Sequence, residues 1–132
     1  MPVAHGRFDV KRTPQGALDL GGDAQGMHLR FDKTFEGPLR ATSVVHMMAV
    51  GTAVEGSAGY VAIERLDGTL DGRSGAFSMM HFGVMDRGHP SLRVEVVPDS
   101  GTDELTGLRG TMTIDITNGE HAYTLDYTLP AA

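Results

Sequence analysis

Frequent glycines and prolines constrain the fold of this chain more than any other sequence feature. Eighteen glycines and six prolines divide its 132 residues into short runs that are rich in Val, Thr, Ile, Phe and Tyr rather than in helix formers. No segment longer than about ten residues shows the period of an amphipathic helix. The sequence therefore predicts an all-β protein, with room for a short helix only in a loop or near the C-terminal tail.

The clearest strand pair lies near the C-terminus. Residues 112–117 and 123–129 each alternate apolar and polar side chains, as a half-buried strand requires. Asn118-Gly119 between them suits a two-residue type I′ turn, because both central residues of that turn need a positive φ. These residues predict an antiparallel hairpin.

The same reasoning predicts six further strands, and so eight in all. They lie at residues 3–11, 27–36, 39–50, 59–70, 73–84 and 91–98. An open sheet of eight strands would leave two long edges free to associate with other chains, and closure into a barrel removes both edges. A sandwich satisfies the same strand count. We expect a single domain over residues 1–132.

The composition excludes several classes of function. The net charge is -6, and the basic residues are scattered, whereas nucleic acid and anionic membranes attract clustered cations. The chain has no cysteine, which excludes disulfides, thiolate metal ligands and a cysteine nucleophile. Neither a membrane-length apolar segment nor an export signal is present, so we expect a soluble, cytoplasmic protein that binds neither nucleic acid nor membrane.

A second turn dipeptide, Asp71-Gly72, predicts the hairpin between the fourth and fifth strands. A two-residue loop determines which residues lie opposite one another on one face. The resulting pairs are Leu70 with Arg73, Leu66 with Phe77, Glu64 with Met79, Ala62 with His81, and Tyr60 with Gly83. Glu64 and His81 are then diagonal neighbours, about 7 to 8 Å apart, which allows a direct or water-bridged hydrogen bond.

If this face points inward, it places a carboxylate and an imidazole in an apolar pocket, where either group can exchange protons near neutral pH. We therefore take Tyr60, Glu64 and His81 as candidate catalytic residues. The candidate substrate-binding residues are Lys33, His46, Met48, Phe77 and Met79, in a pocket of thioether and aromatic side chains. The alternative is a structural polar contact or a solvated rim, and a slip of one residue in the turn would put Glu64 and His81 on opposite faces.

Two further features concern charge and metal binding. Lys33 interrupts an apolar strand face, so it needs either Glu64 as a partner or a strand end from which it reaches water. His46, His81 and Glu64 make a conceivable metal-binding set, but the chain lacks a His-x-His pair and a phosphate-cradling loop. We predict no metal and no cofactor.

The other face of the same hairpin is also apolar. It carries Val61, Ile63, Met80 and Phe82, interrupted by Arg65 and Ser78. Because a small barrel buries only its inner face, this outer face predicts a subunit interface in a homo-oligomer, a dimer or trimer. The alternative is a terminal segment or loop that folds over it.

Several motifs occur together in the middle and late parts of the chain. They are Glu64-Arg65, Gly68-Thr69-Leu70, Gly72-Arg73-Ser74-Gly75, Phe77, His81, Val97-Pro98, Ser100-Gly101-Thr102, Glu104-Leu105, Gly107-Leu108-Arg109-Gly110, His121 and Tyr123-Thr124-Leu125-Asp126-Tyr127. In this combination the chain resembles, over residues 31–127, an uncharacterised bacterial family of unknown function. The resemblance implies an eight-stranded allene oxide cyclase-like barrel, often self-associating, with a central apolar cavity. It implies no activity and transfers no catalytic residue from the plant cyclases.

Three functions are therefore compatible with the sequence. The first is a cyclase or isomerase that holds an apolar small molecule in the barrel cavity and assists proton transfer with the Glu64/His81 pair. The second is a non-catalytic carrier or sensor of lipophilic small molecules that uses the same cavity. The third is a structural oligomeric domain whose lumen is filled by its own side chains.

Overall fold

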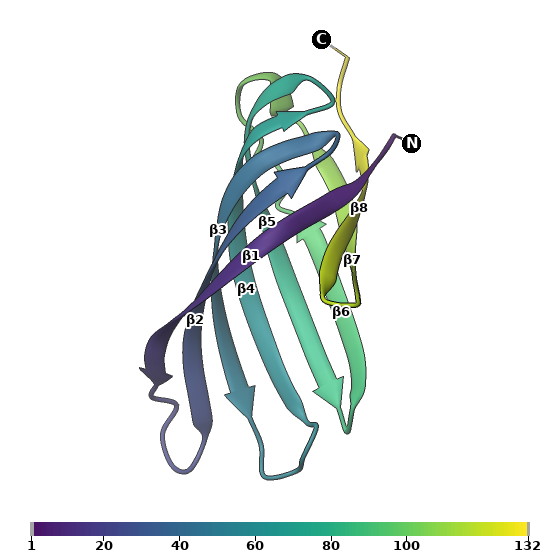
Figure 1. The fold of residues 1–132 in the computed structure, drawn as a ribbon. Helices are drawn as coiled ribbons and strands as arrows, with labels where there is room; N and C mark the ends of the chain where they lie inside the picture. The colour runs from purple at the N-terminus through teal and green to yellow at the C-terminus, as the bar shows by residue number, and fades with distance from the viewer. Residues whose placement is uncertain (1, 132) are drawn as a thin grey trace.

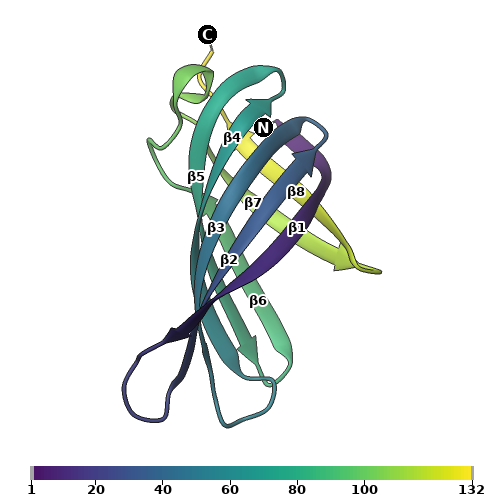
Figure 2. The same cartoon turned by 60° about the vertical axis from the view of Figure 1, so that its left-hand side comes forward.

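The computed structural model describes residues 2–131, which form eight β-strands and one short 3-10 helix. The elements are β1 (Val3–Leu18), β2 (Gln25–Glu36), β3 (Leu39–Gly51), β4 (Ala58–Leu70), β5 (Arg73–Asp86), β6 (His89–Val96), η1 (Asp103–Leu105), β7 (Arg109–Thr117) and β8 (Glu120–Thr128). Each strand pairs with the next along the chain, and β8 pairs with β1, which closes the barrel (Figures 1 and 2). The predicted all-β, eight-stranded antiparallel barrel is confirmed. Within the described residues, no helix is long and apolar enough to cross a membrane.

The first strand is longer than the sequence predicts. We expect it to end near residue 11, before the turn-forming residues Pro14 and Gly16, but β1 continues to Leu18. The register with β2 shifts between Pro14 and Gly16, and Gly16 has a φ of 124°. A β-bulge therefore absorbs residues that would otherwise break the strand.

Both turn dipeptides have the conformation that their sequences predict. Asp71 and Gly72 have φ values of 48° and 83°, and Asn118 and Gly119 have 53° and 79°. The β4–β5 register follows directly, with Leu70 opposite Arg73 and each expected pair in place. The predicted inner face of this hairpin is the buried one.

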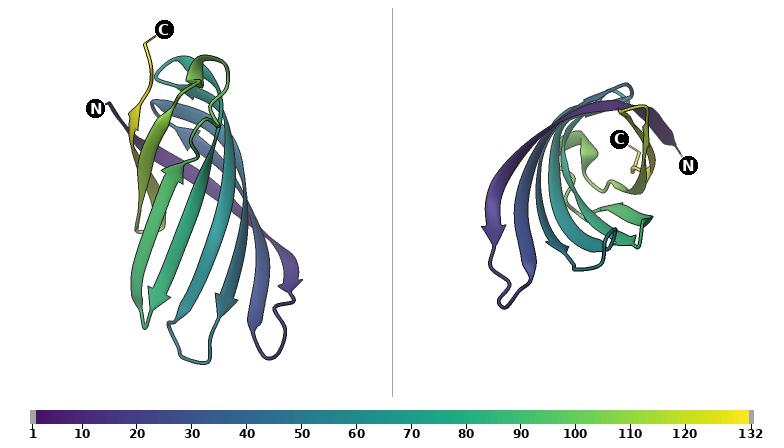
Figure 3. Two further views of the ribbon diagram at one scale, coloured as in Figure 1. Left: turned by 180° about the vertical axis from the view of Figure 1, so that it is seen from behind. Right: turned by 60° about the horizontal axis from the view of Figure 1, so that its bottom comes forward.

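The strands pair unevenly, so the barrel is closed at one end and open at the other. β1 pairs with β8 only over residues 3–8, and β6 shares two residue pairs with β7. In contrast, β2 to β5 pair along nearly their whole lengths. The ribbon views show β2 to β6 extending well beyond the short β7–β8 hairpin (Figure 1 and Figure 3, left).

A loop takes the place of a strand beside the closed end of β5. Residues 97–108 run along the edge of β5. Side-chain oxygens of every second residue from 100 to 104 accept hydrogen bonds from backbone N–H groups of every second residue of β5. The pairs are Ser100 with Ser78 N, Thr102 with Ala76 N, and Glu104 with Ser74 N. This loop therefore satisfies a strand edge that β6 does not reach.

Side chains fill the lumen at the closed end. Large residues with at most 2% exposure there include Phe35, Leu39, Leu66, Leu70, Phe77, Leu105, Leu108, Tyr123 and Leu125. The Tyr123 hydroxyl accepts a hydrogen bond from Leu39 N–H at 3.1 Å and donates to the Glu36 carbonyl at 2.9 Å. It thereby links β8 to the turn between β2 and β3.

Replacing Tyr123 with Phe should lower the free energy of unfolding by about 1 to 3 kcal/mol, because Leu39 N–H and the Glu36 carbonyl lose a hydrogen-bond partner in the folded state. Urea unfolding followed by circular dichroism measures this change. Amide exchange should accelerate at Leu39 more than at Val45 in the middle of the same strand. Unchanged stability together with unchanged exchange at Leu39 would contradict the assigned role of the hydroxyl.

Candidate active site

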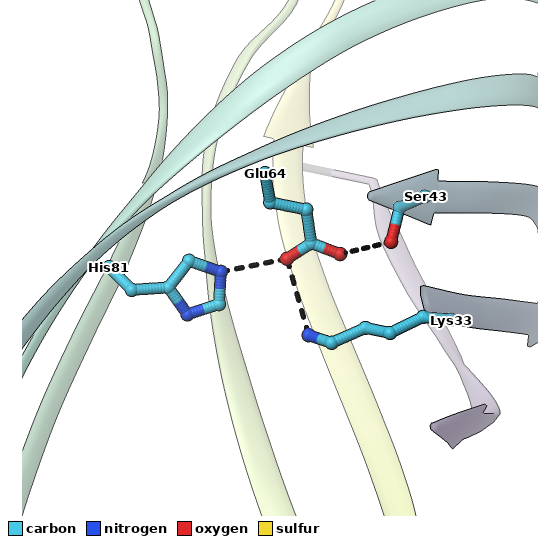
Figure 4. A network of polar contacts seen from close by, with 4 residues as sticks. All are labelled: Lys33, Ser43, Glu64 and His81. Atoms are coloured by element: carbon cyan, nitrogen blue, oxygen red, sulfur yellow. Dashed lines mark hydrogen bonds and ion pairs between the residues drawn. The ribbon is translucent and has the colours of Figure 1, made fainter. Parts of the chain in front are cut away.

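A buried carboxylate lies at the centre of a four-residue polar network in the lumen (Figure 4). Glu64 Oε1 accepts hydrogen bonds from His81 Nε2 at 2.7 Å and from Lys33 Nζ at 3.2 Å. Its Oε2 accepts from the Ser43 hydroxyl at 2.6 Å. Glu64 has 0% exposure, and each of its three partners is at most 8% exposed.

Strand register brings these four residues together from four neighbouring strands. Lys33 on β2 lies directly opposite Ser43 on β3. Glu64 on β4 lies opposite Val45, one diagonal step from Ser43. His81 on β5 is one diagonal step from Glu64 on the other side. The diagonal contact between Glu64 and His81 that the Asp71-Gly72 turn predicts is thus confirmed.

The surroundings of Glu64 keep it ionised. Burial by itself would raise the pKa of this carboxyl. The hydrogen bond from His81, the positive charges of Lys33 and His81, and the hydrogen bond from Ser43 act in the opposite direction, and together they lower the pKa of Glu64 below its usual value. The carboxylate is therefore a charged acceptor at neutral pH, with both of its oxygens already bonded.

Lys33 has three partners inside the barrel. Besides its ion pair with Glu64, its ammonium nitrogen lies 4.7 Å from the ring centre of Phe8 and 5.8 Å from that of Phe35. Such contacts with aromatic faces stabilise a cation that has left water. Of the two expectations for Lys33, pairing with Glu64 is confirmed.

The carboxylate also determines which nitrogen of His81 carries the proton. Because ionised Glu64 can only accept, His81 Nε2 is the donor, and a neutral imidazole then presents Nδ1 as an acceptor. Within the described residues, no protein group forms a hydrogen bond with this nitrogen. It lies on the side of the ring away from the Glu64 carboxylate (Figure 4).

A cavity of about 170 Å³ lies beside this network, towards the open end of the barrel. Its wall consists almost wholly of inward-facing apolar and aromatic side chains, and the polar groups on it include Lys33, Tyr60, His81 and His121. The apolar residues of the wall are Phe8, Val10, Phe31, Val45, Met47, Ala62, Leu92, Ile114 and Ile116. The lumen is therefore packed at one end and hollow at the other.

Tyr60 reaches this cavity because a glycine lies opposite it. Gly83 is its cross-strand partner, and a Cβ atom added to Gly83 would lie 1.9 Å from a carbon of the Tyr60 ring. The ring thus lies directly over the Gly83 backbone. Burial raises the pKa of Tyr60, so its hydroxyl is protonated and can donate a hydrogen bond at neutral pH.

The structure separates the predicted site residues into three groups. Lys33, Tyr60 and His81 line the cavity, with Glu64 behind them. Phe77 and Met79 face the lumen but belong to the packed core, with 2% and 0% exposure. His46 and Met48 lie on the outer surface, so their placement in the cavity is wrong. The physical reason is strand alternation, because their odd-numbered neighbours on β3 face the lumen.

Sequence reasoning missed Ser43 and Phe8, which hold Glu64 and Lys33 in place. Ser43 has a detectable signal, since it interrupts the buried alternation of Leu39, Ala41 and Val45. Phe8 has none, because its diagonal contact with Lys33 depends on the register of β1 with β2, in which Val10 lies opposite Lys33. Within residues 2–131, no group of three or more His, Asp or Glu side chains could hold a metal ion. His46 lies too far outside to join His81 and Glu64.

Comparison with known proteins places the chain in a family. Residues 4–127 match the model of a family described as "Protein of unknown function (DUF3224)". The chain belongs to the DUF3224 family. It is similar to the crystal structure of a DUF3224 protein of unknown function from Shewanella oneidensis MR-1, with 48% sequence identity, 99% of each chain covered and a TM-score of 0.92. No curated protein is significantly similar. The resemblance to an uncharacterised bacterial family is confirmed for this DUF3224 protein, and a relation to allene oxide cyclases stays a prediction.

Replacing Glu64 with Gln should lower the free energy of unfolding by about 3 to 5 kcal/mol, because the substitution leaves the Lys33 ammonium buried without its counter-charge. Adding Lys33→Met to this variant should recover most of the loss, because the unpaired charge is then gone. Chemical unfolding of the wild type, both single variants and the double variant measures this coupling. Strictly additive losses would contradict a buried ion pair.

The pH dependence of stability should carry the signature of Glu64. Its pKa is lower in the folded state than in the unfolded state, so the stabilisation is fully present above the unfolded pKa of about 4.3 and is lost as the pH falls through the lower folded pKa. The difference in unfolding free energy between the wild type and Glu64→Gln should therefore shrink below about pH 4. Unfolding curves at several acidic pH values measure this difference, and a constant difference would contradict the lowered pKa.

Proposed function

We propose that this DUF3224 protein is an isomerase or cyclase that moves a proton on a compact apolar substrate held in the open half of the lumen. One observation carries the proposal. A fully buried, ionised Glu64 holds an ammonium and an imidazole through a single oxygen, and the Lys33 and His81 side chains both line an apolar cavity. A carboxylate that orients an imidazole in this way is the arrangement that makes histidine an effective general base.

The proposed reaction assigns a separate role to each residue. His81 Nδ1 removes a proton from a carbon next to a carbonyl group of the substrate, and the electron pair moves onto the carbonyl oxygen as an enolate. The Lys33 ammonium stabilises that oxygen. The imidazolium then returns the proton to another carbon, so a double bond shifts without any other reactant. For ring closure, the enolate carbon instead bonds to an electron-poor alkene carbon of the same molecule, and the imidazolium protonates the carbanion that results. Glu64 stabilises the imidazolium and acts as a positioning residue, since it lies behind His81 and Lys33.

The cavity limits the size of the part of the substrate that reacts. Its volume is about 170 Å³, and an engineered apolar protein cavity of about 150 Å³ accommodates benzene. Because the cavity opens to solvent beside Leu92 and Ile116, the part of a substrate that lies inside is the size of one small ring, and the remainder can project from the opening. The part inside is apolar and carries one oxygen, because apolar side chains surround the few polar groups of the wall.

A compact cyclic β,γ-unsaturated ketone tests this proposal, because isomerisation to the conjugated ketone is visible in the ultraviolet. His81→Gln should lower kcat by a factor of about 10² to 10⁴, since Gln can donate to Glu64 but cannot act as a base. His89→Gln is the matched control at an exposed histidine in the β5–β6 turn region and should leave kcat unchanged. Equal rates for the wild type and His81→Gln would contradict the assignment of the base.

The second candidate function is a non-catalytic carrier. It is favoured by the fact that both carboxylate oxygens of Glu64 already accept hydrogen bonds from the protein. Such a network stabilises a polar cluster without any reaction. Binding of a saturated cyclic ketone of the same size, followed through the NMR signals of the His81 imidazole, separates the two functions. Binding by the wild type without turnover of any unsaturated ketone in a panel would overturn the enzyme proposal in favour of the carrier.

A further inference from the structure

The outer surface of the barrel carries an apolar patch that is independent of the lumen. Five side chains from β3, β4 and β5 form this outer apolar face. They are Met48, Val61, Ile63, Met80 and Phe82, with exposed fractions of 50%, 46%, 63%, 46% and 56%. A groove of about 590 Å³ crosses the face. Soluble monomers rarely expose so many large apolar side chains side by side, so a contiguous patch of this kind marks an interaction site.

Strand pairing arranges this face in two parallel rows that cross five strands. The first row runs Arg30, His46, Ile63, Met80, Glu95, and the second runs His28, Met48, Val61, Phe82, Arg93. Each row has a β-branched residue at its centre and polar residues at its ends. The first row also has opposite charges at its two ends, with Arg30 on β2 and Glu95 on β6.

An identical surface complements the end charges of the first row, whereas His28 of the second row meets Arg93, and exposed Arg65 on β4 meets Arg65 beside its own-chain partner Asp67. A two-fold axis parallel to β4 places each row of one copy against the same row of the other copy, in the reverse order. In the first row, Ile63 then lies against Ile63, His46 against Met80, and Arg30 against Glu95 at both ends. In the second row, Met48 meets Phe82, and these longer side chains can enter the groove of the opposite copy. Self-complementarity about a two-fold axis is the requirement for an isologous dimer.

We infer that a second copy of this chain covers the outer apolar face, in a symmetric dimer whose two-fold axis runs close to the direction of β4. The two outer faces then pack as aligned sheets, with β4 against β4 and β2 of each copy against β6 of the other. Apolar side chains fill the centre. Arg30 of each copy pairs with Glu95 of the other at the rim, where both residues already have ion-pair partners in their own chain, Asp32 and Arg93.

The described part of the chain leaves this face open. Both ends of the described chain lie at the closed end of the barrel, beside β8 (Figures 1 and 2). The loop of residues 97–108 is also held there, along β5. The alternative of a covering loop or terminal segment is therefore not met within the described residues, and a second copy is the occupant that the matched Arg30 and Glu95 charges favour.

Sedimentation equilibrium and native mass spectrometry test the dimer. The wild type should be a dimer with a micromolar or lower Kd, and Ile63→Glu should be a monomer, because it places two carboxylates face to face in an apolar contact. Thr113→Glu is the matched control on the outer surface of β7 and should remain a dimer. Because Ile63 is 63% exposed, its replacement should leave the circular dichroism spectrum unchanged. A monomeric wild type, or a dimeric Ile63→Glu, would overturn the inference.

A charge swap tests the direction of the two-fold axis. Arg30→Glu and Glu95→Arg should each raise the dimer Kd about tenfold or more, since each creates like-charge contacts at both ends of the row. The double variant should bind more tightly than either single variant, because the charges across the contact are again opposite, although each substitution also removes an ion pair within the chain, with Asp32 or with Arg93. A double variant that is weaker than both single variants would overturn the proposed axis. None of these outcomes depends on a reaction in the lumen, so they test the dimer separately from the proposed function.

Discussion

The two-residue turn at Asp71-Gly72 determines the register on which the lumen depends. Both residues adopt a positive φ, which matches the twist of the flanking strands and permits no extra loop residue. A shift of one residue would turn every side chain of β5 to the other face. Glu64 would then lie buried without His81, and the aromatic core at the closed end would lose Phe77. The turn therefore decides both the packing of the barrel and the composition of its polar network.

A charge inside an apolar barrel persists only if its surroundings replace water. Glu64 meets this requirement with three donors, two of which can be cationic, and Lys33 does so with a carboxylate and two aromatic rings. The network lies at the boundary between the packed half of the lumen and its hollow half. This position is what makes it a candidate site, because Lys33 and His81 are held on one side by the core and reach the cavity on the other.

The uneven pairing of the strands explains why such a small barrel contains a cavity. Where β8 and β7 close the sheet, side chains from all sides meet and fill the lumen. Where β1 and β6 continue without a partner on one side, fewer side chains reach the centre and a hollow remains. The same extended strands present the outer apolar face to solvent. The inner and outer faces of β3 to β5 thus take different roles in the two proposals, a small-molecule site inside and a contact between two copies outside.

The sequence by itself determined the strands, the turns and one face of one hairpin. Alternation and turn dipeptides are local properties, so eight strands and the contact between Glu64 and His81 could be predicted from neighbouring residues. The sequence did not predict where β1 ends, because the residues of the bulge, Pro14 and Gly16, are also typical of a strand break. Tertiary structure alone decided that His46 and Met48 face outward, that Ser43 and Phe8 complete the site, and that the lumen is only half filled. These outcomes depend on closure of the sheet between β1 and β8, which are far apart in the chain, and on the registers of the β1–β2 and β3–β4 pairs. The loops that join those two pairs are longer than a two-residue turn, so no local pattern encodes their registers.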